Sequence, residues 1–305
     1  MSQWESLFDQ AASIINQANS SFKLLDSWTF GGGTALMLQI NHRESFDIDI
    51  FVDDPQVLPY LNPTTQGYTL QVNPDEYVSD GTHALKIVFA GIGEIDFICA
   101  PSLTNDPTSR VAVRGIQVDL ETPGEIIAKK VHYRGSSLQP RDMFDIACIA
   151  KACGDGYVLE ALLPFKNRAA AALAVAERMD AGLASTVMGK LQYREGYCGY
   201  FENCSSDDNL AFESGVRSQA IGIRSAFLYV SALISTQLGD LSYTAVRSII
   251  LSVRIIPISQ QNQVRAAPAS VSELRRKCLA NPRRVDDGSN PFKSHNIAGR
   301  PALLG

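Results

Sequence analysis

The feature that most constrains the fold of this chain is a triple glycine followed, about a dozen residues later, by two aspartates in an alternating apolar segment. The glycine segment 31–36 is GGGTAL and the acidic segment 43–51 is RESFDIDIF. Side chains at i and i+2 of a strand project to the same face, so Asp47 and Asp49 share one side, away from the isoleucines that alternate with them. The pattern predicts a short strand at 28–30, a glycine turn, a helix and a second strand.

Paired aspartates on one face of a strand favour a metal site. Oxygen ligands suit Mg²⁺, and a bound cation relieves the repulsion between two carboxylates. We therefore predict Asp47 and Asp49 as metal ligands. A third carboxylate is usual in such sites, and a predicted strand at 93–98 offers Asp96 as the first candidate and Glu94 as the second, on the same face. The alternative is that these acids are ordinary solvent-facing strand residues.

The glycines themselves are candidates for binding phosphate. Backbone N–H groups of Gly32, Gly33 and Thr34 would lie at the start of a helix, where glycine allows close approach and the helix terminus is electropositive. The alternative is that the glycines form only a tight turn. Ser45 could contact a substrate or bond its own turn.

Two later helices carry further charged candidates. Thr122 is a candidate N-cap, with Glu125 completing a capping box. The helix that follows carries Lys130 as a cation for a triphosphate, and Lys129 is a rival for that role. The next helix begins at Pro140.

Two acids lie one turn apart on that next helix. Asp142 and Asp145 are therefore predicted to face the same side. Asp142 could act as a base, position the lysine, or simply pair with Arg141 at the helix start.

Other segments show clear periodicity. Apolar residues at helical spacing predict an opening helix over 4–18. Strands are expected at 68–72 and 83–89, and alanine-rich helices over about 157–190. After about residue 255, prolines punctuate a segment with few large apolar residues, so a loosely ordered tail is expected.

Composition points to a globular protein without a membrane segment. The chain has 305 residues, of which 45% are hydrophobic. The apolar run 226–234 is far shorter than the ~20 residues that span a bilayer. The first five residues lack the basic and apolar regions of a secretory signal, so we expect a cytoplasmic protein. The cysteines show no CxxC pair and no zinc-ligand spacing.

The formal net charge of −5 is spread unevenly along the chain. Acidic residues predominate up to residue 204 and basic residues over 205–305. Such a basic segment could contact nucleic acid, or it could be an ordinary solvated surface.

Four motifs in order resemble the AbiEii/AbiGii nucleotidyltransferase toxin family. They are GGTAL at 32–36, RxSxDIDIF at 43–51, TPxEIIAKK at 122–130 and RDxxD at 141–145. The resemblance covers roughly residues 25–190. Residues 205–305 do not resemble a known continuation of the family.

The resemblance implies an α+β fold, with an N-terminal polymerase-β-like domain, a mixed sheet flanked by helices, followed by a helical region. The expected boundaries are 1–120 for the catalytic domain, 121–255 for a helical domain that contributes the lysine and aspartate motifs, and 256–305 for a poorly ordered tail.

The resemblance also implies an activity and its residues. Members transfer a nucleoside monophosphate from an NTP with two Mg²⁺ ions, and are commonly toxins of toxin–antitoxin or phage-defence pairs. The implied partners are an NTP, an RNA acceptor such as tRNA, and an antitoxin protein. The matching residues are Asp47 and Asp49 for metal, Arg43 and Ser45 beside the phosphates, the motif lysine Lys130, and the last acid Asp142.

Two other functions compete with RNA modification. The chain could instead modify a small hydroxylated molecule, as antibiotic nucleotidyltransferases do. It could also be a degenerate nucleotide-binding module that binds a partner protein, although the intact acids and lysine argue against degeneration.

Overall fold

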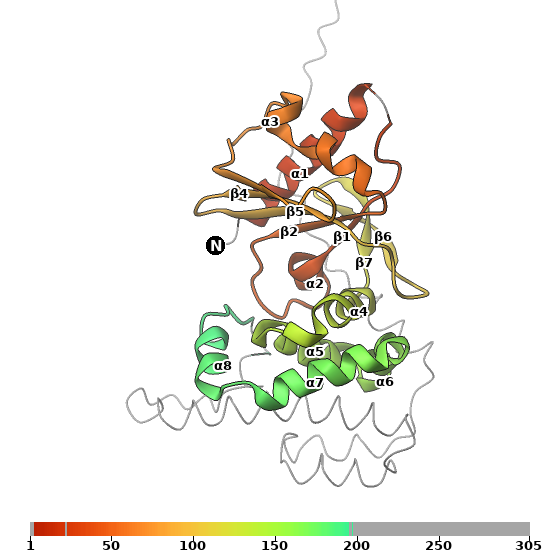
Figure 1. The fold of residues 1–305 in the computed structure, drawn as a ribbon, viewed down its shortest axis with the longest axis vertical. Coiled ribbons are helices and arrows are strands. Elements are labelled where there is room, and N and C mark those ends of the chain that lie inside the picture. The colour runs from red at the N-terminus through yellow and green to blue at the C-terminus, as the bar shows by residue number, and fades with distance from the viewer. Residues whose placement is uncertain (1–2, 22, 195–196, 198–305) are drawn as a thin grey trace, which may run out of the picture.

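The computed structural model describes residues 3–21, 23–194 and 197 (Figure 1). The predicted tail 256–305, and the part of the predicted helical domain after residue 197, lie outside the described residues. Within the described part, no helix is both long and apolar enough to cross a bilayer.

A seven-stranded mixed sheet forms the centre of the described part, with the strand order β3-β4-β5-β2-β1-β7-β6. The strands are β1 (Thr29–Gly31), β2 (Ile48–Val52), β3 (Glu76–Ser79), β4 (Ala84–Phe89), β5 (Gly93–Cys99), β6 (Thr108–Val113) and β7 (Ile116–Glu121). The acid-bearing strand β2 lies between β5, to which it is parallel, and β1, to which it is antiparallel.

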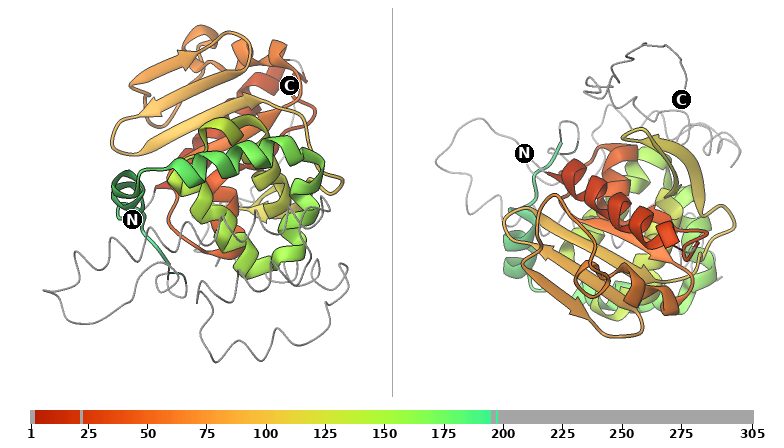
Figure 2. Two further views of the ribbon diagram at one scale, coloured as in Figure 1. Left: turned by 60° about the horizontal axis from the view of Figure 1, so that its bottom comes forward. Right: turned by 90° about the horizontal axis from the view of Figure 1, so that it is seen from above.

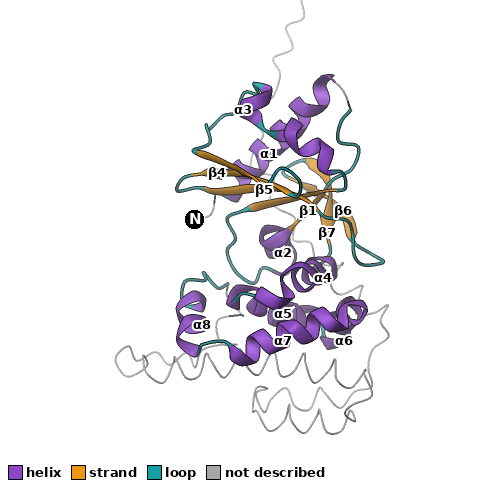
Figure 3. Ribbon diagram, in the orientation of Figure 1, coloured by secondary structure: helices purple, strands orange, loops and turns teal. Residues whose placement is uncertain are grey.

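Helices cover both faces of this sheet (Figure 3). The helices are α1 (Trp4–Ser21), α2 (Gly32–Ile40), α3 (Pro63–Gln66), α4 (Pro123–Arg134), α5 (Pro140–Cys153), α6 (Asp155–Leu162), α7 (Lys166–Arg178) and α8 (Ala181–Met188), with 3₁₀ turns at Pro55–Leu61, Gly135–Ser137 and Leu163–Phe165. Helix α1 crosses one face, and α2 and α4 lie on the other, with α5 to α8 stacked beyond them (Figures 1 and 2). This confirms the predicted α+β fold, a mixed sheet flanked by helices and followed by a helical region.

The alternation in β2 sorts its side chains as predicted. Ile48, Ile50 and Val52 are buried, and α1 contacts β2 and β5 on that side. Asp49 and Phe51 point to the opposite face, because Asp49 lies against Gly32 of α2 and the ammonium group of Lys129 in α4 lies 3.8 Å from the Phe51 ring centre. One face of the strand therefore supplies core and the other supplies polar chemistry.

The prediction of a strand at 68–72 is wrong. This segment has no strand in the structure, and β3 follows it instead. Side chains of α1 satisfy its backbone: Gln17 donates to the carbonyl of Thr69 and accepts from its N–H, and Gln10 accepts from the N–H of Gln71. A segment whose backbone is already paired in this way does not need a neighbouring strand.

The predicted capping box at the start of α4 is half right. The Thr122 hydroxyl accepts from the N–H of Glu125 at 3.2 Å, as an N-cap should. The Glu125 carboxylate, however, accepts from the N–H groups of Leu103 and Thr104 and from the Thr104 hydroxyl. It therefore holds the loop before β6 to α4.

Ile50 tests the core face of the acid-bearing strand. We expect Ile50→Ala to lower the free energy of unfolding by about 2–5 kcal/mol, because the side chain is 0% exposed and its removal leaves a cavity. Val78→Ala, on edge strand β3 at 48% exposure, is the matched control and should change it by less than about 0.5 kcal/mol. Urea unfolding measures both, and equal effects would contradict the assigned faces.

Candidate active site

A cavity of about 950 Å³ lies between the sheet and the helical layer. Its charged lining is divided between the two layers. The strands and the segment leading into β2 supply the acids, namely Glu44, Asp47, Asp49, Glu94, Asp96 and Glu121, together with Arg43 and Lys86. The helices supply Lys129, Lys130, Arg134 and Arg141, and Lys190 follows α8. An anionic sheet face opposite a cationic helix face suits a ligand that brings both phosphates and metal ions.

The strand register brings Asp49 and Asp96 together. Asp49 of β2 is directly opposite Asp96 of the parallel strand β5, and Asp96 is opposite Lys86 of β4. Neighbouring strands lie about 4.8 Å apart, and directly opposite side chains share a face. Asp96, the first candidate for the third carboxylate, therefore lies beside Asp49. Asp47 is close by, and its Oδ1 accepts from the N–H of Glu94 at 3.2 Å.

Asp47, Asp49 and Asp96 resist ionisation in the protein without a bound cation. Burial, together with the nearby carboxylates of Asp96 and Asp47, raises the pKa of Asp49 to about 7. Burial also raises the pKa of Asp47, with Glu94 adding to the effect, and it raises the pKa of Asp96. A divalent cation would remove this penalty, so the donor set fits Mg²⁺ in its chemistry.

The cluster is not preassembled for a metal ion. Among the residues that the structure describes, no three His, Cys, Asp or Glu side chains converge closely enough to hold one. Glu94 and Asp96 are instead both bonded to the ammonium group of Lys86, which lies 3.2 Å from Asp96 Oδ2.

The glycine turn packs directly against the acids. Gly32 has φ +68°, and a Cβ there would overlap the Asp49 carboxylate. A Cβ at Gly33 would lie 2.8 Å from Ser45 Oγ and 3.1 Å from an Arg43 guanidinium nitrogen. Helix α2 starts here without a side-chain cap. Its first N–H groups are therefore suited to an anion.

The side chain of Thr34 does not line the cavity and makes a structural hydrogen bond instead. Its side chain is completely buried, and its hydroxyl donates to the carbonyl of Asp47 at 2.5 Å. This bond ties α2 to the segment leading into β2. Any contact of Thr34 with phosphate would come from its backbone.

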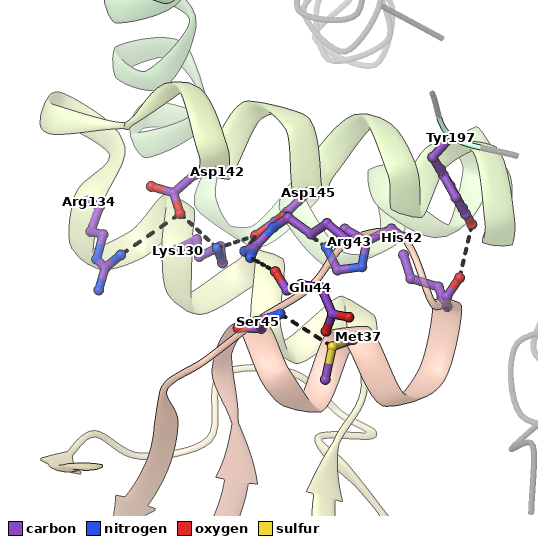
Figure 4. A network of polar contacts seen from close by, with 11 residues as sticks. Met37, His42, Arg43, Glu44, Ser45, Lys130, Arg134, Asp142, Asp145 and Tyr197 are labelled. Carbon is purple, nitrogen blue, oxygen red and sulfur yellow. Dashed lines mark hydrogen bonds and ion pairs between the residues drawn. The ribbon is translucent and has the colours of Figure 1, made fainter. Parts of the chain in front are cut away.

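Arg43 and Lys130 meet at one buried carboxylate, that of Asp145 (Figure 4). Arg43 donates from Nε to Asp145 Oδ1 at 2.8 Å and from Nη2 to Oδ2 at 3.0 Å. Lys130 Nζ donates to Asp145 Oδ2 and to Asp142 Oδ1, both at 2.7 Å. His42 also contacts Asp145 Oδ1 at 2.9 Å. Arg43 and Lys130 both line the cavity.

These pairs keep the network charged. Burial would raise the pKa of Asp145, but Arg43 and Lys130 hold it well below its ordinary value. Burial would lower the pKa of Lys130, but the carboxylates of Asp145 and Asp142 raise it. The lysine therefore carries its positive charge at neutral pH.

Asp142 lies behind the lysine, not in the cavity wall. It is 0% exposed, bonds Lys130, and has an Arg134 nitrogen 3.8 Å from its Oδ1. This geometry fits the alternative in which Asp142 positions the lysine, and it does not show the pairing with Arg141. Asp145 was not predicted as a site residue, although its position in the RDxxD motif was the available signal.

Lys129 belongs to a separate buried cluster. Its Nζ donates to Glu121 Oε1 at 2.6 Å, and the same oxygen accepts from the Thr29 hydroxyl at 2.7 Å. Lys129 is 5% exposed and Glu121 is 1% exposed. The pair ties α4 to β7 and β1, whereas Lys130 points towards α5. The two candidate lysines thus have different partners.

Comparison with known proteins finds a matching family and similar solved structures. A family model described as "Nucleotidyl transferase AbiEii toxin, Type IV TA system" matches residues 14–218. No curated protein matches the chain. A crystal structure titled "putative nucleotidyltransferase from H. pylori" is similar with a TM-score of 0.41 and 14% identity, over 80% of this chain and 99% of that one.

The burial of Asp49 predicts that the free energy of unfolding depends on pH when no metal is bound. The pKa of this carboxyl is near 3.8 when the chain is unfolded and about 7 when it is folded, so its burial destabilises the fold increasingly as pH rises from about 4 to above 7. We expect Asp49→Asn to raise the free energy of unfolding by about 1–3 kcal/mol at pH 8, and by less at pH 5. Urea unfolding in EDTA measures this, and a pH-independent difference would contradict it.

The Lys129 cluster predicts a structural defect. We expect Lys129→Met to lower the free energy of unfolding by about 3–5 kcal/mol, because it leaves the Glu121 carboxylate buried without its counter-ion. The double variant with Glu121→Gln should recover at least half of the loss. Urea unfolding measures both, and a single variant as stable as the unsubstituted protein would exclude a structural role.

Proposed function

The chain belongs to the AbiEii nucleotidyl transferase toxin family of type IV toxin–antitoxin systems, and we propose that it transfers a nucleoside monophosphate from an NTP to an RNA acceptor, with Mg²⁺ held by Asp47, Asp49 and Asp96. The family makes it a nucleotidyltransferase and implies an antitoxin partner. The RNA acceptor, with tRNA as the leading candidate, the two metal ions and the residue roles are our proposal. So is the cytoplasm as its place of action.

The register of Asp49 beside Asp96, next to a glycine turn, is the observation that carries this proposal. Nucleotidyl transfer asks mainly for positioning and charge neutralisation. When bound, divalent cations would neutralise the charge of the phosphates during transfer. The acids that would carry them line the same cavity as Gly32 and Lys130.

The other residues have separate proposed tasks. Backbone N–H groups of Gly32 and Gly33 would bind the outer phosphates, next to Ser45. Arg43 and Lys130 would add positive charge there, both oriented by Asp145. Asp142 would hold Lys130 from behind, so that its ammonium group keeps a fixed position as phosphate charge shifts.

The acceptor class is supported by the charges around the cavity. Arg134, Arg141 and Lys190 line it together with the acids, and Arg141 and Lys190 are exposed. Such residues suit an acceptor that carries its own phosphates, because cations beside the site attract a polyanion. A small uncharged acceptor would need no such residues.

Label transfer tests the proposal. The full chain is incubated with cellular RNA, Mg²⁺ and each of the four α-labelled NTPs in turn. We expect label on RNA with at least one NTP, and a loss of at least about 10³-fold in Asp47→Asn and Asp49→Asn, because each removes a ligand for the metal. Asp9→Asn, which changes an acid of α1 on the opposite face of the sheet, should retain full activity.

Each alternative has a distinct outcome in the same experiment. Label that appears on a small hydroxylated molecule and never on RNA would contradict the RNA acceptor. NTP binding by calorimetry without turnover on any acceptor would contradict the transfer itself. Either result would leave the family assignment unchanged.

A further inference from the structure

Lys86 has an unusual place in the candidate active site. It is on β4, opposite Asp96, and thus in the same cross-strand row as Asp96 and Asp49. Its ammonium group bonds Glu94 Oε2 and lies 3.2 Å from Asp96 Oδ2. Lys129, Lys130, Arg134 and Arg141 of the wall come from helices, whereas Lys86 comes from the sheet itself. The activity as proposed gives it no task.

The surroundings of Lys86 are strongly anionic. Asp47, Asp49, Glu94 and Asp96 line the same part of the cavity, and the side chain of Asp96 is only 18% exposed. Carboxylates so close together repel each other unless a cation lies among them. In the described part of the chain no three of these acids converge on a metal position, and the ammonium group bonds two of them instead.

We propose that Lys86 is the counter-ion of this carboxylate cluster in the metal-free protein, and that it competes with the divalent cation for Asp96. It would thereby set how tightly the protein binds metal. This inference rests on the proposed function, because it takes Asp49 and Asp96 as metal ligands. Lys86 is in this view a positioning residue, which acts on the metal through Asp96.

Electrostatics gives the direction of its effect on metal binding. Lys86 is one strand from Asp96, so a cation held between Asp96 and Asp49 would lie well within about 10 Å of the ammonium group. Two positive charges at that distance repel each other, and burial weakens screening by solvent and salt. Removing the ammonium charge should therefore tighten metal binding while destabilising the metal-free protein.

Direct measurement of Mn²⁺ binding tests this without any assay of activity. The full chain is titrated with Mn²⁺ at fixed pH and ionic strength, and free Mn²⁺ is followed by electron paramagnetic resonance. We expect Lys86→Met to bind Mn²⁺ about tenfold more tightly than the unsubstituted protein. Lys86→Arg, which keeps the charge, should bind within about threefold of it. Arg110→Met, which removes the cation of the exposed ion pair between Arg110 of β6 and Asp119 of β7, should leave binding unchanged.

Thermal unfolding in EDTA and in Mn²⁺ gives a second readout. Lys86→Met should have a lower Tm than the unsubstituted protein in EDTA, and a larger gain in Tm on addition of Mn²⁺. If Lys86→Met does not fold without metal, Lys86→Gln provides the same comparison with a polar side chain.

The possible outcomes separate this inference from the proposed function. If the unsubstituted protein does not bind Mn²⁺, or if Asp49→Asn leaves binding unchanged, the proposed metal site is wrong. If binding depends on Asp49 but Lys86→Met binds Mn²⁺ equally or more weakly, the role of Lys86 alone is overturned. Tighter binding by Lys86→Met together with near-normal binding by Lys86→Arg supports it.

Discussion

The buried carboxylate of Asp145 is the interaction on which the architecture of the site depends. It is 0% exposed and bonds Arg43 from the loop before β2, Lys130 from α4, and His42. A charge buried so completely is tolerated only with partners in good geometry. Helix α5 can therefore dock only where those partners are, and this docking places the cationic helices opposite the acidic face of the sheet.

Local sequence patterns predicted those features of the structure that depend only on residue spacing along one helix or strand. The alternation over Ile48 to Val52 identified both faces of β2, and the RDxxD spacing placed Asp142 and Asp145 on one side of α5. The β6–β7 hairpin was missed, although Arg114 and Gly115, with φ of +48° and +79°, form its turn. Two positive φ values are typical of the tightest hairpin turns, and a glycine between two alternating segments was the available signal.

What the sequence could not predict depends on contacts between distant elements. Lys129 and Lys130 are neighbours on one helix, and helical spacing alone cannot decide which acids each of them meets. The pairing is decided by tertiary structure: Glu121 at the end of β7 bonds Lys129, whereas Lys130 bonds Asp142 and Asp145 of α5. Register has the same effect for Asp96, because its place beside Asp49 depends on the parallel pairing of β2 with β5.

The two faces of β2 perform opposite thermodynamic tasks. On one face, Ile48 and Ile50 are fully buried and contribute the apolar area that stabilises the fold. On the other, burial and the neighbouring carboxylates raise the pKa of Asp49, so its ionised form is disfavoured there. A buried carboxylate of this kind destabilises the fold, and the strongly apolar reverse face of β2 offsets that cost. Because the side chains of a strand alternate, both tasks fit within the same five residues.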